Sequence, residues 1–323
     1  MSEDSKKTTQ AIVNEAVEWL LKQQSKDGWQ GDIRATCYAI QALILSGFGT
    51  SERSVELGSY YLCVKQDAET GAWCQNDGDT AEALRTLMIC GKTCQDKPIE
   101  DGINALNNLK THGEVVIRSE AGWIHPNLVA RAFVSLGQNP TELLKTLSPF
   151  LDGTAGFDTK YTSRSVLVYK EARINDDALI HKAEVFLKKS ANNISVLSGE
   201  YIGLLIQALV AIGYKFEDGI IQNIITYLEK IQQTNGSWEN NVKATSQIVI
   251  GLAKAGFRYK KPSFFNRKNV ARISILLITF GVALGLWYSP LQASASFIVN
   301  SVGLLLGIIV ILEWSYPKIK LRV

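Results

Sequence analysis

The sequence predicts an all-α protein made of helical hairpins and followed by two transmembrane helices. Three observations predict this fold. Apolar residues recur three and four positions apart, a two-helix unit repeats with a period near 44 residues through residue 259, and two later stretches carry no charge. With 46% hydrophobic and 20% charged residues over 323 positions, the chain can bury one large core or two modest ones.

The repeats share one order of parts: an amphipathic first helix, a turn with Gly before an aromatic residue, and a more apolar second helix that in five of them stops at a glycine. The turns lie at 23–30, 65–73, 119–123, 152–157 and 232–238, and the closing glycines are Gly47, Gly91, Gly137, Gly213 and Gly256. The interval of 76 residues between Gly137 and Gly213 holds two shorter repeats, one of them around Thr162 to Arg173. We expect the first helices at 9–24, 54–66, 98–110, 141–151, 177–189 and 218–233. The contrast in polarity predicts an inner layer of buried helices inside an outer amphipathic layer.

Six hairpins whose turns carry Gln, Gly and an aromatic residue, as in QQSKDGWQ and QQTNGSW, resemble the α/α-toroid of the prenyltransferase and squalene-hopene cyclase superfamily, which is built from QW repeats. The resemblance covers about 250 residues and implies that residues 1–259 form a ring of six hairpins. We expect the repeated Gln and Trp to act as structural staples. The Trp ring would pack between neighbouring outer helices, and the Gln amide would close a helix end.

The segment CQNDGDTAEAL at 74–84 resembles the D-x-D-D-T acid motif of class II cyclases in this superfamily, whose middle Asp donates the proton. With Thr80 placed on the Thr of the motif, Asn76 takes the first Asp and Asp79 the last. Gly78 then stands where the proton donor would be, and glycine has no side chain with which to protonate an alkene. We therefore expect no catalytic residue.

The repeat itself accounts for part of this segment. A Thr lies eleven residues before the closing glycine in three repeats, as Thr36, Thr80 and Thr245, which predicts a helix-start residue that caps free N–H groups. The repeat does not account for Asp77 and Asp79. They are either favourable charges at a helix N-terminus or groups that orient Arg34 or Arg85.

Metal and cofactor chemistry are not expected. Protein prenyltransferases bind zinc through Asp, Cys and His, but in RATCYAIQAL the residue before Cys37 is Thr36 where that branch has a histidine. The five cysteines form an odd set without zinc-site spacing, and the N-terminus has no apolar signal core. The body is therefore expected to be reduced and cytosolic.

A polar stripe runs along the otherwise apolar second helices. Counting back six positions from the closing glycines gives Gln41, Arg85, Arg131, Gln207 and Ile250, and one or two turns earlier lie Arg34, Tyr38, Glu82, Lys243 and Gln247. Such a stripe is expected to face a central cavity. The candidate ligand-binding residues are Arg34, Gln41, Asp77, Asp79, Glu82, Arg85, Arg131, Arg164, Gln207 and Lys243.

Three interpretations of this stripe stay open. The cations could clamp an anionic small molecule, because guanidinium groups suit phosphate and carboxylate. They could instead pair inside the protein with the carboxylates Asp77, Asp79, Glu82, Asp158 and Glu200. A partner protein on the acidic rim is a third option. A cyclase needs a dry aromatic cavity, so the polar stripe disfavours a hydrocarbon substrate.

The C-terminal region predicts a membrane hairpin at 273–316, between a basic linker at 260–272 and a basic tail at 317–323. The stretches 273–288 and 293–312 carry no charge and approach the roughly 20 residues needed to cross a bilayer. Basic residues flank the two charge-free stretches but are absent from the loop between these stretches. The positive-inside rule therefore places the protein in the inner (cytoplasmic) membrane, with the ring and both termini cytoplasmic.

Both expected spans contain a small-residue spacing that lets helices approach closely: Gly281 with Gly285, and Gly303 with Gly307. These glycines and Asn300, a polar group within hydrocarbon, predict either a hairpin packed on itself or a homo-oligomer. Residues 260–323 hold eight Lys/Arg and a single Glu, so the basic excess lies in the tail. Nucleic acid is therefore not expected as a partner, whereas the lipid bilayer is.

Three classes of function follow. The first is a non-catalytic ring that senses a ligand or partner and controls a membrane-disrupting hairpin, as in bacterial antiphage defence proteins that couple a recognition domain to short membrane spans. The second is a membrane-bound isoprenoid cyclase or prenyltransferase-like enzyme, and the third is a membrane-tethered scaffold. The missing acid and the paired glycine spacings favour the first.

Overall fold

The computed structural model describes residues 3–112 and 125–260, and this part of the chain is all-α. It holds twelve α-helices, one short 3-10 helix and one two-stranded hairpin. The chain divides into two compact units, Met1–Lys260 and Lys261–Val323. The second unit contains the expected membrane spans with Gly281, Gly285, Asn300, Gly303 and Gly307, and lies outside the described residues. Among the helices that are described, none is long and apolar enough to cross a bilayer.

First and second helices alternate along the chain. The first helices are α1 (Glu3–Gln23), α3 (Arg53–Val64), α5 (Lys97–His112), α7 (Thr141–Asp152), α9 (Asp177–Asn192) and α11 (Gly219–Ile231). The second helices are α2 (Ile33–Leu45), α4 (Asp77–Ile89), α6 (Pro126–Ser135), α8 (Thr159–Glu171), α10 (Gly199–Ile212) and α12 (Val242–Lys254). The small elements are β1 (Gln24–Ser25), β2 (Gly28–Trp29) and η1 (Ile194–Val196).

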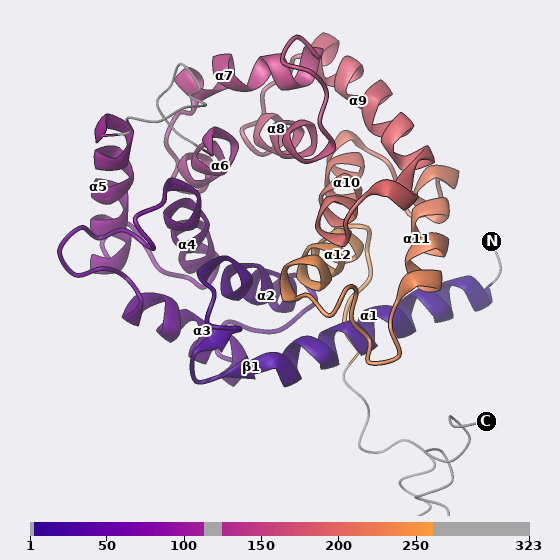
Figure 1. The fold of residues 1–323 in the computed structure, drawn as a ribbon, viewed down its shortest axis with the longest axis horizontal. Coiled ribbons are helices and arrows are strands. Elements are labelled where there is room, and N and C mark those ends of the chain that lie inside the picture. Colours follow the sequence, from indigo (N-terminus) through magenta and orange to yellow (C-terminus); the bar gives the residue numbers. More distant parts are fainter. Residues whose placement is uncertain (1–2, 113–124, 261–323) are drawn as a thin grey trace, which may run out of the picture. The chain divides into compact units, whose positions relative to one another are not determined.

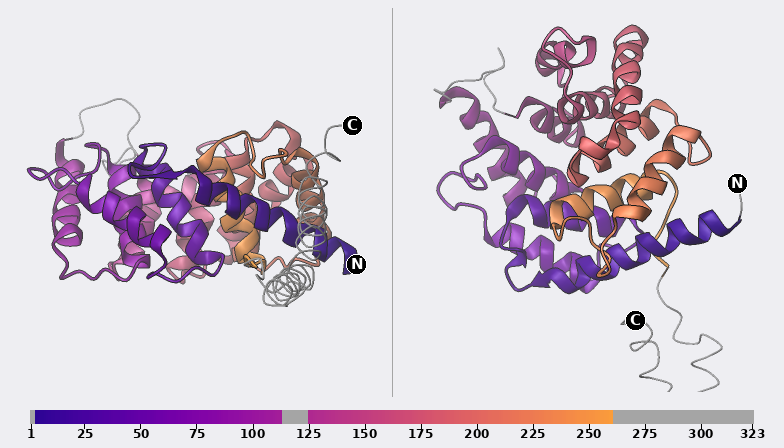
Figure 2. Two further views of the ribbon diagram at one scale, coloured as in Figure 1. Left: turned by 90° about the horizontal axis from the view of Figure 1, so that it is seen from below. Right: turned by 45° about the vertical axis from the view of Figure 1, so that its right-hand side comes forward.

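The second helices form the inner layer. Each packs against the next, from α2 through α4, α6, α8 and α10 to α12, and α12 packs against α2, so that their contacts close a circle. Figure 1 shows the first helices outside this circle. At the point of closure, α1 lies beside α11 and α12, which brings the two ends of the described chain together (Figure 2).

The helix bounds agree well with the sequence pattern. Five of the six first helices begin and end within three residues of the predicted ranges, and α1 begins earlier, at Glu3. The predicted contrast in burial is also confirmed. Second helices such as α2 and α12 are buried over most of their length, whereas first helices such as α3 and α11 bury only one stripe.

A Trp at three of the turns fastens the inner layer to the outer one. Trp29, Trp73 and Trp238 are fully buried. Their indole Nε1 groups donate hydrogen bonds to carbonyls near the end of the preceding outer helix, at Leu20 (2.7 Å), Leu62 (2.7 Å) and Leu228 (3.0 Å). The Trp29 and Trp73 rings also lie against Gly58 of α3 and Gly102 of α5, which are in the following outer helices. The expected packing of the Trp between outer helices is therefore confirmed for these two rings.

The recurrent Thr has a different role from the one its position suggests. The residues that cap the inner helices are Asp32, Asn76 and Asn241, whose side chains accept from backbone N–H groups of the first turn. The Thr hydroxyl instead accepts from the backbone N–H of the Trp, at distances of 3.0 to 3.1 Å for the pairs Trp29–Thr36, Trp73–Thr80 and Trp238–Thr245. The prediction that Thr caps its own helix was wrong because an Asp or Asn four residues earlier already does so.

The Gln at these turns links one outer helix to the next. Gln66 Nε2 donates to the carbonyls of Gly71 (2.8 Å), in its own turn, and Pro98 (2.9 Å), at the start of α5. Gln232 makes the same pair of bonds to Gly236 (2.9 Å) and to Ile12 of α1 (3.0 Å). This second pair joins the end of α11 to α1, so one repeated staple also closes the circle.

The close approach of Trp29 to α3 gives a first test of the staple. A Cβ added at Gly58 would lie 2.8 Å from Trp29 Cζ3 and 2.9 Å from Ile40 Cδ1. We expect Gly58→Ala to lower the free energy of unfolding by about 1–3 kcal/mol through overpacking, measured by denaturant unfolding of the full chain in detergent. Gly49→Ala is the control, because its nearest neighbour would be Ser51 Oγ at 3.8 Å. Equal stability of the two variants would show that the Trp ring does not hold α3.

Candidate functional site

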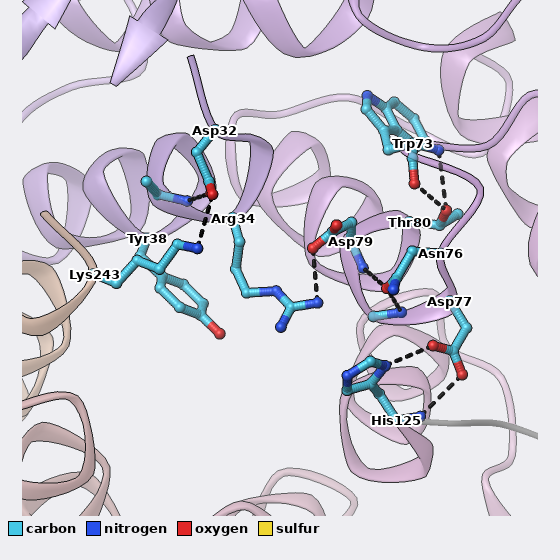
Figure 3. Close-up of polar contacts among 12 residues, drawn as sticks. Asp32, Arg34, Tyr38, Trp73, Asn76, Asp77, Asp79, Thr80, His125 and Lys243 are labelled. Carbon is cyan, nitrogen blue, oxygen red and sulfur yellow. Dashed lines mark hydrogen bonds and ion pairs between the residues drawn. The ribbon is translucent and has the colours of Figure 1, made fainter. Parts of the chain in front are cut away.

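The segment that resembles an acid motif forms the start of α4. Asn76 is the N-cap, and its Oδ1 accepts from the backbone N–H groups of Gly78 (2.8 Å) and Asp79 (3.0 Å). Thr80 points the other way, to Trp73 (Figure 3). Two members of the segment therefore serve the helix start and the turn, which leaves Asp77 and Asp79 as the groups directed at neighbouring helices.

Asp77 connects the starts of two inner helices. Its carboxylate accepts from the backbone N–H of His125 (2.9 Å), and its Oδ1 lies 2.7 Å from His125 Nδ1. His125 is the residue before α6. Asp77 is 5% exposed, so its charge is held by these contacts and is not open to a substrate.

Gly78 stands at the position where the motif that this segment resembles has its proton donor. Two side chains occupy the space beside it. A Cβ added there would lie 2.7 Å from Arg34 Nη2 and 2.8 Å from both Cγ and Nδ1 of His125. Figure 3 shows Arg34 and His125 converging on this part of α4. The packing therefore disfavours an acid at position 78, because any side chain there would displace the Arg34 guanidinium or the His125 ring.

Two ion pairs join adjacent inner helices at their N-terminal ends. Arg34 Nη2 of α2 lies 2.7 Å from Asp79 Oδ1 of α4, and Lys243 Nζ of α12 lies 2.8 Å from Oδ2 of Asp32, the N-cap of α2 (Figure 3). Burial alone would raise the pKa of Asp32. The hydrogen bonds from Lys243 and from the Ala35 N–H more than offset it, so the pKa of this carboxyl is lowered.

One arginine crosses the interior. Arg164 of α8 is 1% exposed, and its Nη2 donates to the hydroxyl of Tyr38 (3.1 Å) on α2 and to Glu200 Oε1 (3.2 Å) on α10. Helices α2 and α8 are not neighbours in the circle of contacts, so the bond to Tyr38 spans it. Burial raises the pKa of Tyr38. Within the described residues, Arg164 Nη1 is a buried donor without a hydrogen-bond partner.

A second polar cluster gathers around Glu171, the last residue of α8. Arg131 of α6 makes a bidentate pair with this carboxylate, from Nε (2.9 Å) and Nη2 (2.6 Å). Arg85 Nη2 of α4 and Lys254 Nζ of α12 each lie 3.8 Å from its Oε1. Three cations from three helices therefore surround one carboxylate.

The surroundings lower the pKa values of both Glu171 and Lys254. Burial by itself would raise the pKa of Glu171, but the positive charges of Arg131 and Arg85 and the hydrogen bond from Arg131 hold it well below its usual range. Burial lowers the pKa of Lys254, and Arg131 adds to this effect more than Glu171 opposes it, so that it falls to about 8. Lys254 is therefore the one cation of this cluster that titrates near neutral pH.

The glutamines extend the network. Gln41 Nε2 donates to Glu82 Oε2 (3.0 Å) and to the Thr86 hydroxyl (2.8 Å), and Gln41 Oε1 accepts from Arg85 Nη1 (2.7 Å). Gln207 Nε2 of α10 donates to Gln247 Oε1 of α12 (2.7 Å).

The structure places all ten predicted ligand-binding residues on inner helices and gives each a polar contact. The geometry favours the interpretation in which the cations pair inside the protein: Arg34 with Asp79, Arg85 with Glu82 (3.6 Å) and Arg164 with Glu200. Two of the expected carboxylates do something else. Asp77 binds His125, and Asp158 caps α8 by accepting from the Tyr161 N–H (2.9 Å).

Sequence reasoning missed the centre of the second cluster, Glu171 with Lys254. The hairpin that contains α8 has no closing glycine, and Arg173 (φ 57°) takes the left-handed position that Gly256 (φ 108°) takes after α12. Counting back two positions from these two residues gives Glu171 and Lys254. The polar stripe was followed only from six positions before the end of each repeat, so these two positions were not considered.

Comparison with known proteins adds no relationship: no protein-family model matches this sequence, and no curated protein matches it significantly. Among residues 3–112 and 125–260, no three His, Cys, Asp or Glu side chains are grouped so that they could hold a metal ion.

The lowered pKa of Lys254 predicts a dependence of stability on pH. Between about pH 8 and pH 10, the unfolded chain keeps this proton while the folded chain has lost it, so folding stability rises with pH. We expect a rise on the order of 2 kcal/mol that is absent from Lys254→Gln and present in Lys182→Gln, an exposed lysine on α9. Denaturant unfolding of the full chain across this range measures it. The same rise in Lys254→Gln would assign the dependence to other groups.

Proposed function

We propose that residues 1–259 are an α/α-toroid of the QW-repeat type that has lost cyclase chemistry and acts as a ligand-binding sensor. In this proposal the ring controls the two-span membrane hairpin expected at 273–316. The closed circle of inner helices, the outer layer and the Trp and Gln staples support the architecture. Control of a membrane-disrupting segment, as in antiphage defence, follows from the expected hairpin and its glycine spacings.

The observation that carries the non-catalytic part is the packing at Gly78. Arg34 Nη2 and His125 stand within 3 Å of where a side chain would begin. A class II cyclase needs an acid at this place of the motif, and the remaining carboxylates are engaged, Asp77 by His125 and Asp79 by Arg34. These contacts occupy both carboxylates and make them poor candidates for the acid that protonates a polyene.

The charges of the interior also disfavour a polyene substrate. Arg85, Arg131 and Arg164 are each less than a tenth exposed and lie on three inner helices, where they contact side chains of other inner helices. A carbocation that forms among fixed guanidinium groups would be repelled. The same charges favour an anion.

Three partly exposed cations lie at the N-terminal ends of inner helices, which favours these ends as the side where a ligand binds. Arg34, Lys160 and Lys243 occupy the same repeat position, the second residue of α2, α8 and α12, and are only partly buried. Helix N-termini add positive potential there. Lys160 has no ion pair within the described part of the chain, and burial, with Arg164 second, lowers its pKa. A small phosphate-bearing molecule fits this chemistry.

Mass spectrometry of small molecules released from the purified full chain tests the proposal. We expect a phosphate-bearing compound that is reduced at least about ten-fold, equivalent to about 1.4 kcal/mol, in the Lys160→Gln/Lys243→Gln variant. Lys182→Gln is the control and should retain it. A cyclised terpene, or turnover of a polyene or a prenyl diphosphate, would contradict the proposal.

A further inference from the structure

The outward face of α3 carries three exposed apolar side chains. Leu57, Tyr60 and Val64 are 47%, 69% and 59% exposed. They lie three and four positions apart and therefore share one face of the helix; we call them the α3 stripe. The opposite face of α3 is buried through residues such as Gly58 and Leu62. The exposed face of α3 therefore combines Arg53 and Glu56 in the first turn with three apolar side chains further on, which is unusual for a face in water.

The α3 stripe is not a property of the repeat. Gly58 and Gly102 both lie against the Trp of the preceding turn, so they align α3 with α5. The positions in α5 that correspond to the stripe hold Asp101, Asn104 and Asn108. The bonds from Gln66 to Pro98 and from Gln232 to Ile12 align α5 with α1 in the same way, and the corresponding positions in α1 hold Glu15, Glu18 and Lys22. The neighbouring outer helices α1 and α5 are therefore polar at all three positions that correspond to the stripe.

The described chain ends close to the start of α3. The Tyr259 N–H donates to the carbonyl of Ser46 (2.9 Å), and the Tyr259 ring lies 5.3 Å from the ring of Phe48. Residues 46–52 lead directly into α3. From this point residues 261–272 can span at most about 40 Å before the first charge-free stretch begins.

We propose that the α3 stripe docks on the surface of the lipid bilayer. The inference rests on the proposed function, in which residues 273–316 enter the membrane next to the end of the ring domain. Leu57 and Val64 enter the boundary between headgroups and acyl chains, and the Tyr60 ring lies at headgroup level with its hydroxyl towards water. The docked stripe holds one side of the ring against the membrane that the sensor controls.

The size of the stripe favours a bilayer over a second copy of the chain. A stable interface between proteins buries roughly 1,200 Å² or more, which three side chains on one helix do not provide. A bilayer needs no complementary shape, and the tether already holds the ring near the membrane at a high effective concentration. A weak patch is sufficient under those conditions.

Photo-crosslinking of the full chain tests this docking. The chain carrying Tyr60→benzoylphenylalanine is reconstituted in phosphatidylcholine and phosphatidylglycerol vesicles, irradiated and analysed by mass spectrometry. The matched control carries the same group at Val185, which is 57% exposed on α9. We expect a lipid adduct at position 60 at least about five-fold above the control, reduced several-fold when Leu57 and Val64 are both replaced by Gln.

Flotation of the vesicles separates the two ways in which the inference could fail. If the chain floats with the vesicles but position 60 gives no more lipid adduct than position 185, docking is wrong and the membrane hairpin stands. A crosslink from position 60 to a second copy also overturns docking and assigns the stripe to an oligomer. If the chain does not float, the membrane part of the proposed function fails, and docking fails with it.

Discussion

The bidentate pair between Arg131 and Glu171 is the interaction on which the centre of this protein depends. Arg131 is almost fully buried, and its two bonds to Glu171 place a carboxylate where Arg85 and Lys254 also converge. Helices α4, α6, α8 and α12 thereby share one negative charge. Without it, Arg131 and Lys254 would lose the carboxylate that they contact, and Arg85 would keep only Glu82 and Gln41. An unpaired buried charge costs several kcal/mol.

The outer layer is held by hydrogen bonds from uncharged side chains, in contrast to the ion pairs of the centre. Hydrogen bonds from Trp and Gln fix three of the turns and close the circle between α11 and α1. The interior of the described chain is a network of ion pairs, with Gly78 packed against Arg34 and His125. Under the proposed function, such an interior suits an anion and opposes a carbocation.

Periodicity predicted most of the fold because the helices repeat both their apolar spacing and their turn residues. It also predicted that Arg34, Arg85, Arg131 and Arg164 lie on inner helices, but their partners depend on which helices meet, and sequence spacing does not contain that information. Asp77 was expected either to favour a helix N-terminus or to orient an arginine, and it binds His125, a residue 48 positions away. Glu171 was missed because the polar stripe was followed only from six positions before the end of each inner helix, and Glu171 lies two positions before Arg173.

The stability of Glu171→Gln, measured by denaturant unfolding of the full chain, tests the account of the centre most directly. If Glu171 compensates the buried Arg85 and Arg131 together with the partly exposed Lys254, the substitution costs about 3–5 kcal/mol, and the same substitution costs far less in an Arg131→Gln background. Glu184→Gln, at an ion pair with Lys188 on the outer helix α9, should cost less than about 1 kcal/mol. A loss for Glu171→Gln as small as that for Glu184→Gln would contradict the account, because the central cations would then be supported by other groups.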